Sequence, residues 1–486
     1  MIEGYIVLLR AHAPLLAIAV PLAVAALTAL IASPRVAWVV ASFGALTTAM
    51  IAVDMAGRIL LGGTQPLMQE GVGLGVDAVG AFGAAIVSLG ALLAVIAAGA
   101  TLKDFGKAAP FALATGLAAS AAWSGVVLAR DFVGLFVGAQ AGWLAVAGVV
   151  ALAALRDRAG LNGALRMLSA GGVSAALMLL GIGLLATSIN GVELSVLATN
   201  WHGAPISAAT GLALISIALA ICAAIAPLHA WAPISYARGG AFAGLLIGTV
   251  ASAGALCGLA RLIAFGVASP EVGGGVSLAL SVLGGASVLV GSAQAVGAAS
   301  LRRLAAYAVA VQGGCILLGI ALGSPAGFEA AFVQLFGLVA SVLALIGGAA
   351  AAGGDTLGAL DGLGRRAPLA SVAITAGALS LMGAPLSIGF LGRWRLIEAA
   401  LGVGWWWVAA VAIAASLAGV FYGGRLIERL YFRRASTAVA ASRDPWRFAL
   451  APALLSAIAA VALGLQPIVL LHAAESASQL VLGRAE

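Results

Sequence analysis

The chain has 486 residues, of which 63% are hydrophobic and 8% are charged, and its mean hydropathy is +1.15. A soluble domain of this length does not have such a composition, so the sequence predicts an integral membrane protein that crosses the bilayer many times. The net charge of +7 does not indicate nucleic-acid binding, because basic and aromatic residues nowhere form the patch that such binding needs.

The first apolar run covers residues 12–32 and is long enough to cross a membrane, so we expect a retained helix rather than a cleaved signal peptide. Further runs long enough to span a hydrocarbon core of about 30 Å follow along the whole chain. Together they predict an all-α integral membrane fold with fourteen helices, at 12–32, 36–57, 79–101, 110–129, 131–155, 165–188, 206–226, 239–265, 273–296, 303–323, 328–352, 368–392, 404–424 and 447–471.

The distribution of basic residues between the loops predicts the topology. Cytoplasmic loops carry an excess of lysine and arginine. Loops after the odd-numbered helices hold 17 of the 24 basic residues, namely Arg35, Lys103, Lys107, Arg156, Arg158, Arg166, Arg238, Arg302, Arg303, Arg365, Arg366, Arg425, Arg429, Arg433, Arg434, Arg443 and Arg447. Both termini are therefore expected on the non-cytoplasmic side. The longest polar stretch, Arg425–Arg447, suits anionic lipid headgroups or a partner subunit.

Small residues are frequent, and the chain has 66 glycines, as in closely packed membrane helices. The three cysteines, Cys222, Cys257 and Cys315, lie in apolar runs without metal-ligand spacing and are expected to be small core residues. No flavin, nucleotide or iron–sulfur motif is present, so we expect no cofactor and no catalytic site in this chain.

Two prolines interrupt the seventh predicted helix. Pro227 and Pro233 lie six residues apart in A-P-L-H-A-W-A-P-I-S-Y, and one regular helix cannot contain both. Broken backbone at membrane depth is tolerated where it is buried in protein or lines a polar cavity, so this stretch indicates a transport path. The alternative is a short turn at the lipid interface with Trp231 as a belt residue.

A second interruption, at Pro385, falls in the twelfth predicted helix, five helices after the first. Two broken helices in corresponding places indicate inverted repeats around a path in the middle of the membrane. We therefore divide the single membrane domain into helices one to three (1–105), a first repeat (106–266, helices four to eight), a second repeat (270–426, helices nine to thirteen) and a cytoplasmic loop with helix fourteen (427–486).

Several motifs resemble those of the antiporter-like membrane subunits. They are the run at Ala226–Tyr236 with Arg261 at the end of the next helix, S-L-R-R-L-A-A-Y at Ser300–Tyr307, R-R-A-P-L at Arg365–Leu369 and G-F-L-G-R at Gly389–Arg393. These subunits occur in respiratory complex I (the NuoL, NuoM and NuoN type), in Mrp cation/proton antiporters and in membrane-bound hydrogenases. The resemblance implies fourteen helices, inverted five-helix repeats and a place beside other membrane subunits in a larger complex.

In that family, proton movement is attributed to a chain of buried glutamate, lysine and histidine residues. At the matching positions this sequence has Gln140, Cys222, Ala253 beside Ser252, and Arg393. The ion path that the resemblance leaves consists of His229, Arg393, Gln140, Gln334, Ser252 and Gln312. Glutamine orders water without exchanging charge, and arginine stays protonated, so the family's pump mechanism is in question here.

Each candidate also has a structural interpretation. His229 could bond a backbone carbonyl freed by the proline break. Arg393 could snorkel or pair with Glu398, and Gln140 could make an interhelical hydrogen bond. Asp77 precedes the third helix, where the helix dipole favours a negative charge.

Three functional hypotheses follow. The first is a membrane subunit of a multisubunit complex that translocates protons or sodium, located in the bacterial inner membrane. The second is a degenerate, transport-silent subunit that scaffolds and seals a neighbouring antiporter-like subunit. The third is a membrane module of an NADH:quinone oxidoreductase-like or hydrogenase-like complex, which contributes coupling but no cofactor.

Overall fold

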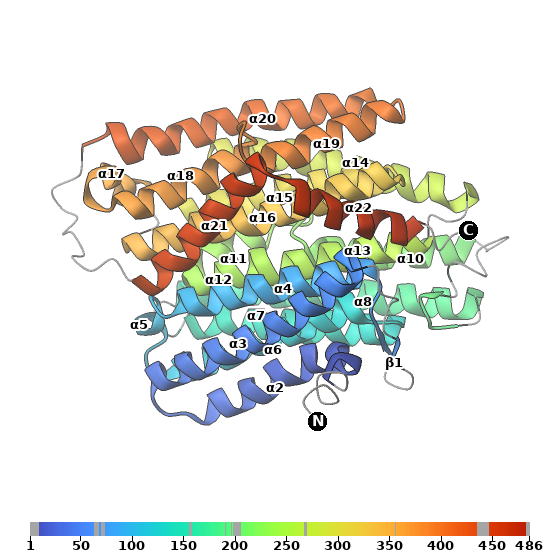
Figure 1. The fold of residues 1–486 in the computed structure, drawn as a ribbon, viewed down its shortest axis with the longest axis horizontal. Coiled ribbons are helices and arrows are strands. Elements are labelled where there is room, and N and C mark those ends of the chain that lie inside the picture. Colours follow the sequence, from blue (N-terminus) through green and yellow to red (C-terminus); the bar gives the residue numbers. More distant parts are fainter. Residues whose placement is uncertain are drawn as a thin grey trace.

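The computed structural model describes residues 9–62, 68–69, 73–153, 155, 158–189, 191–195, 197, 206–266, 270–354, 356–434 and 447–482. The molecule is a bundle of helices whose axes run in roughly one direction (Figure 1). The longer helices are α2 (Ala13–Leu30), α3 (Pro34–Ala56), α4 (Ala78–Ala98), α6 (Ala109–Leu128), α7 (Phe132–Ala153), α8 (Ala159–Ile189), α10 (Ile206–Cys222), α13 (Ser252–Gly266), α14 (Pro270–Val296), α15 (Leu301–Ala321), α16 (Pro325–Ala352), α18 (Pro368–Met382), α19 (Ile388–Gly402), α20 (Trp406–Ile427), α21 (Arg447–Leu465) and α22 (Ile468–Leu482).

Short elements connect or extend these helices. They are α5 (Leu102–Phe105), α11 (Ala232–Arg238), α12 (Gly240–Leu246), α17 (Leu363–Arg366), the π-helices η1 (Gly57–Leu61), η3 (Ile247–Ala251) and η5 (Glu428–Phe432), and the 3₁₀-helices η2 (Gly106–Ala108) and η4 (Leu357–Leu360). Strands β1 (Met68–Gln69) and β2 (Leu74–Gly75) form a small antiparallel hairpin, in which Met68 pairs with Gly75.

The all-α membrane architecture is confirmed. In the described residues, twelve helices are long and apolar enough to cross a membrane, and two shorter apolar helices are α10 and α18. These fourteen helices overlap the fourteen predicted runs one by one, and the two short ones are the predicted broken helices seven and twelve. The number of crossings, the inverted relation of the two repeats and the division into four parts remain predictions.

The predicted boundaries were wrong at the C-terminal end. Helix fourteen ends at Leu465 rather than at 471, and Gln466 and Pro467 separate it from a further helix, α22. Pro467 has no amide hydrogen and cannot continue the preceding helix, which the hydropathy pattern alone does not reveal. Helix thirteen also extends through η5 to Phe432, so the first eight residues of the predicted polar stretch, 425–432, are helical. Its residues 435–446 lie outside the described part of the chain.

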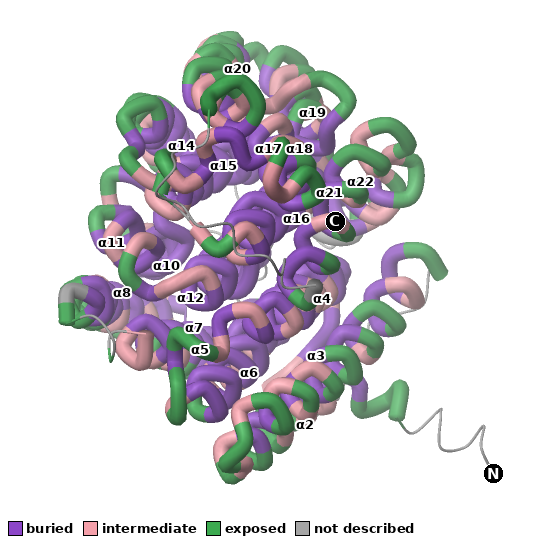
Figure 2. Tube along the Cα trace, turned by 90° about the vertical axis from the view of Figure 1, so that its left-hand side faces the viewer, coloured by how far each residue is buried: buried purple, intermediate pink, exposed green. Residues whose placement is uncertain are grey.

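The core lies along α4, α12, α15 and α16, which are buried over most of their lengths, whereas α2, α20 and α22 expose much of their surfaces (Figure 2). Small residues bring neighbouring helices together, as predicted. A Cβ at Gly211 of α10 would lie 2.7 Å from the carbonyl oxygen of Gly181 in α8, and one at Gly314 of α15 would lie 2.7 Å from that of Gly284 in α14. These helix pairs therefore need glycine at their crossing points.

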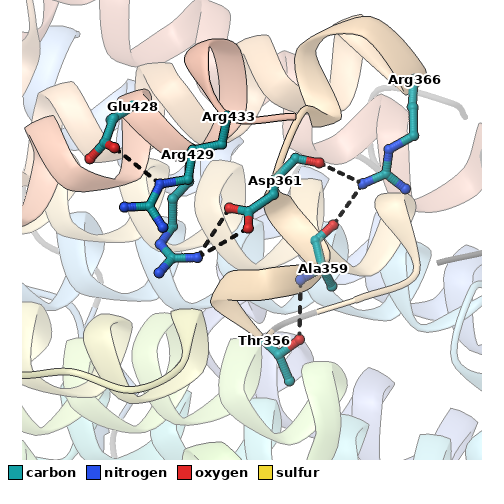
Figure 3. A network of polar contacts seen from close by, with 7 residues as sticks. All are labelled: Thr356, Ala359, Asp361, Arg366, Glu428, Arg429 and Arg433. Carbon is teal, nitrogen blue, oxygen red and sulfur yellow. Dashed lines mark hydrogen bonds and ion pairs between the residues drawn. The ribbon is translucent and has the colours of Figure 1, made fainter. Parts of the chain in front are cut away.

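A polar network joins the loop before α18 to the end of α20 (Figure 3). Arg429 of η5 donates to the Asp361 carboxylate over 3.0 Å, and the amide of Gly362 donates to the Arg429 carbonyl over 2.9 Å. Arg366 donates to the backbone carbonyls of Ala359 and Asp361. The basic loops after predicted helices eleven and thirteen thus lie at the same end of the bundle, as the charge pattern requires.

Candidate functional site

The first break covers residues 223–231, between α10 and α11. Ala224 adopts a left-handed conformation with φ of 59°, and the Ala226–Pro227 peptide is cis. Pro233 lies in the first turn of α11, where a helix does not use the missing amide hydrogen. The predicted interruption is therefore present, with Pro227 inside it and Pro233 at the start of the next helix.

The backbone groups freed by the first break are bound by neutral side chains. The Trp231 indole donates to the carbonyl of Ile221 over 3.1 Å. The amide of Ala226 donates to the Ser287 hydroxyl over 2.9 Å, and this hydroxyl donates to the carbonyl of Ala310 over 2.7 Å. Trp231 is 3% exposed, with its ring 4.6 Å from that of Trp143, so its interpretation as a lipid-belt residue was wrong.

His229 is therefore available for another role. Its Nε2 lies 2.5 Å from the Gln294 side-chain oxygen, whereas its buried Nδ1 has no hydrogen-bond partner among the described residues. The prediction that His229 bonds a freed carbonyl was thus wrong, because Trp231 does so at Ile221. His229 borders a cavity of about 450 Å³, which Gln294, Arg303 and Tyr307 also line.

The second break covers residues 383–387, between α18 and α19, and contains Pro385 as predicted. Gly383 and Leu386 have φ angles of 74° and 69°. The Ser387 hydroxyl accepts from the amide of Phe390 and begins α19. Ala224 and Leu386 are the described residues other than glycine with left-handed backbones, so one such residue lies in each break. Backbone held in this region is strained and concentrates at functional sites.

Arg393 binds backbone carbonyls at the start of the second break. Its Nη1 donates to the carbonyl of Met382 over 2.5 Å and to the Ser416 hydroxyl over 2.9 Å, while its Nη2 donates to the carbonyl of Leu381 over 2.6 Å. These two carbonyls end α18, where the helix dipole favours a positive charge. Arg393 is 2% exposed, and no ion pair joins it to a carboxylate within the described ranges.

The predicted pairing of Arg393 with Glu398 was wrong. The Glu398 carboxylate instead accepts from Trp394 over 2.7 Å and from Arg395 over 3.3 Å at the surface of α19. Arg393 and Glu398 are five residues apart, which does not place them on the same helix face, and the helix turns Arg393 inward. Its snorkelling interpretation was wrong as well, because the guanidinium is buried.

Two predicted glutamines extend the second break into α15 and α16. Gln312 donates to the carbonyl of Leu381 over 3.1 Å, and Gln334 donates to the side-chain oxygen of Gln312. The Tyr422 hydroxyl donates to the same Leu381 carbonyl over 3.2 Å. Arg393, Gln312 and Gln334 therefore form one buried polar cluster around the end of α18.

Within the described part of the chain, no side-chain hydrogen bond joins either break to the remaining predicted path residues, Ser252 and Gln140, or to the substituted family positions Cys222 and Ala253. The Cys222 thiol lies 3.5 Å from the Ser174 hydroxyl, and Ala253 has no polar side chain. The Ser252 hydroxyl and the Gln140 side-chain nitrogen are buried without a partner in the described part of the chain. Within the described residues, the interhelical hydrogen bond expected of Gln140 is therefore not made by its side-chain nitrogen.

Asp77 and Arg261 form a separate buried pair. Arg261 donates to the Asp77 carboxylate over 2.6 Å, and Asp77 also accepts from the amide of Gly80 over 2.7 Å. Asp77 therefore stabilises the start of α4, as predicted, and Arg261 additionally donates to the carbonyl of Ala129. All of these groups are bound to one another, which indicates a structural role.

Sequence reasoning missed Ser287, Ser416 and Tyr422 as partners of the breaks. Ser287 lies seven residues before Gln294 in an apolar run, on the same helix face, and this spacing could have identified it. Ser416 and Tyr422 are also polar residues within an apolar run, but nothing in their spacing indicates the backbone carbonyls of a distant helix.

The family model for "NADH:quinone oxidoreductase/Mrp antiporter, TM" matches residues 129–419, which is more than half of the chain and includes both breaks. The chain belongs to this family. Similar family members are subunit N 1 of the NADH-quinone oxidoreductase of Solidesulfovibrio magneticus, 32% identical over 271 residues, and subunit N 2 of that of Syntrophobacter fumaroxidans, 30% identical over 263 residues. The first match covers 54% of this chain and 56% of its relative, and the second covers 53% and 55%. The chain thus spans about half the length of these relatives.

Solved structures match nearly the whole fold. A chain of the Mrp complex from Dietzia sp. superimposes with a TM-score of 0.85 over 98% of both chains, at 23% identity. A chain of respiratory complex I from Thermus thermophilus has a TM-score of 0.75 at 25% identity, over 93% of this chain and 98% of that chain. The family resemblance predicted from the motifs is confirmed.

Proposed function

We propose that this chain is a membrane subunit of a multisubunit complex of the complex I or Mrp type and that it contributes to ion translocation. The observation that supports this most strongly is the line of polar contacts between the two breaks. On one side His229 contacts Gln294 and the backbone of Ala226 contacts Ser287. On the other, Gln312 and Arg393 meet at the carbonyl of Leu381.

Two neighbouring helices connect these contacts. Ser287 and Gln294 both belong to α14, and the Ser287 hydroxyl donates to Ala310 of α15, two residues before Gln312. Irregular backbone and polar side chains of this kind are retained at membrane depth where ions or polar substrates pass. In this proposal His229 is the titratable member of the line, since histidine changes its charge near neutral pH, whereas Arg393 is a fixed charge.

The proposal includes a location and partners. The chain would lie in the bacterial inner membrane beside other membrane subunits, with both termini on the non-cytoplasmic side. The excess of basic residues in the loops after odd-numbered helices supports this orientation. Protons are the proposed ion because the line contains a histidine, whose side chain can take up and release a proton.

A transport-silent scaffold is the second candidate, and the contacts of Arg393 favour it. The guanidinium is bound to two helix-ending carbonyls and therefore stabilises the fold without any need for transport. The two lysines of the chain, Lys103 and Lys107, both lie outside the core of the bundle, so the family's buried lysines have no counterpart.

Proton flux into proteoliposomes that contain the complete complex distinguishes the two candidates. We expect His229→Ala to reduce flux at least about tenfold while the complex stays assembled, because a positioned proton-transferring side chain typically contributes about a hundredfold or more. The matched control is His472→Ala in α22, an exposed histidine outside the two breaks, which should leave flux unchanged. Unchanged flux in the His229→Ala complex would establish the scaffold instead.

A further inference from the structure

A second cavity lies away from both breaks, at the end of the bundle where α3 and α21 begin and α5 lies (left in Figure 1). Its volume is about 700 Å³, and its walls include Trp38, Val39, Leu102 and Phe448. Val39 is 43% exposed and Phe448 is 50% exposed, so the cavity is a groove that opens on the outer surface of the bundle.

The apolar wall of the groove is held in place by specific contacts. The Trp38 indole donates to the carbonyl of Val95 in α4 over 2.9 Å. Its ring also lies 4.7 Å from that of Phe448 in an edge-to-face arrangement. The two rings therefore join α3, α4 and α21 into one preformed surface, which needs little reorganisation to receive an apolar chain.

The groove also carries positive charge. Arg35 and Lys103 line the groove, and the described residues that line it include no carboxylate. Ser33, Pro34 and Arg35, at the start of α3, also line the groove, and the Ser33 side chain makes no capping hydrogen bond to the first turn. The amides of a first turn and two neighbouring cations together favour an anion.

From this arrangement we infer that the groove is a binding site for one anionic phospholipid. The phosphate would lie between Arg35, Lys103 and the first turn of α3, and an acyl chain would pack against Trp38, Val39 and Phe448. The headgroup end and the apolar end are arranged in the order that a lipid has in a bilayer. The basic loops place this end at the membrane surface that carries most anionic lipid.

Lipid titration of the delipidated full-length chain, read by native mass spectrometry, tests the inference. We expect the wild type to hold one phosphatidylglycerol at concentrations at which phosphatidylethanolamine does not bind. Arg35→Gln with Lys103→Gln should weaken this binding at least about tenfold, because each cation near a headgroup contributes to it. The matched control is Arg158→Gln with Arg365→Gln, two exposed cations of other loops, and should bind like the wild type.

Val39→Trp tests the apolar half of the site independently, because it fills the groove without changing charge. It should reduce phosphatidylglycerol binding to a similar extent while the thermal unfolding midpoint stays near that of the wild type. Equal binding of the two lipids by the wild type, or wild-type binding by the double charge variant, would overturn the inference. The same titration is then made on the assembled complex. Loss of phosphatidylglycerol binding there would mean that a neighbouring subunit occupies the groove, and this result would also overturn the inference.

Discussion

The two helix breaks are built alike but are closed by different chemistry. Each interrupts an apolar helix at a proline, and each contains one left-handed residue other than glycine, Ala224 or Leu386. The first break satisfies its backbone with Trp231 and Ser287, which are neutral. The second satisfies its carbonyls with Arg393, which is charged.

The two breaks also differ in how their ionisable residues contact the backbone. In the first break the freed backbone needs nothing from His229, which contacts Gln294 and faces a cavity. In the second break the ionisable residue is itself the group that stabilises the helix end. Arg393 cannot leave its position without leaving the Met382 carbonyl without its side-chain donor in the interior, whereas the Leu381 carbonyl would keep Gln312 and Tyr422.

The largest effect on stability is expected at Arg393. Arg393→Ala removes three hydrogen bonds and leaves two buried carbonyls without their cation, which should lower the free energy of unfolding by roughly 3 kcal/mol. Unfolding of the detergent-solubilised chain with a denaturing surfactant measures this. The control is Arg395→Ala, which removes surface contacts to Glu329 and Glu398 and should cost about 0.5 kcal/mol. Similar losses in the two variants would contradict the conclusion that Arg393 stabilises the second break through its hydrogen bonds.

The packing beside the second break predicts a smaller loss. A Cβ at Gly392 would collide with the side-chain oxygen of Gln334, so Gly392→Ala should cost about 2 kcal/mol and separate α16 from α19. Gly402→Ala in the same helix is the control, because nothing lies within 4 Å of the added carbon. Thermal unfolding of both variants compares them directly, and an unaffected Gly392→Ala chain would show that the glutamine cluster is not tightly packed.

The first break should be less sensitive, because each of its contacts is neutral. Trp231→Phe keeps a ring against Trp143 but loses the hydrogen bond to Ile221, which should cost about 1 kcal/mol. Trp406→Phe, at a tryptophan that is 71% exposed, should have no measurable effect on the same unfolding curve. If Trp231→Phe destabilised the chain more than Arg393→Ala, the contrast between the two breaks would be reversed.

The sequence predicts the fold well, because membrane helices are encoded by long apolar runs and their interruptions by prolines such as Pro227 and Pro385. It also identified Gln312, Gln334 and Arg393, which meet in one cluster. The partners of these residues were not predictable. Arg393 binds the backbone carbonyls of Leu381 and Met382, and because every residue has a backbone carbonyl, the sequence does not indicate which carbonyl a side chain will bind. For the same reason the sequence did not exclude a lipid-belt position for Trp231 or a carbonyl bond from His229, and both of these alternatives were wrong.

We propose that the titratable step belongs to the first break and that the second break holds a fixed charge. This proposal is tested most directly by proton flux through the assembled complex with His229→Gln and, separately, with Arg393→Lys. Glutamine retains a hydrogen-bonding side chain without titrating, so we expect flux to fall at least about tenfold. Arg393→Lys keeps an amine donor at this position, and because no proton transfer is assigned to Arg393, flux through an assembled complex should stay within about twofold of the wild type. Retained flux with His229→Gln, together with lost flux in an assembled Arg393→Lys complex, would contradict the account and place the step in the second break.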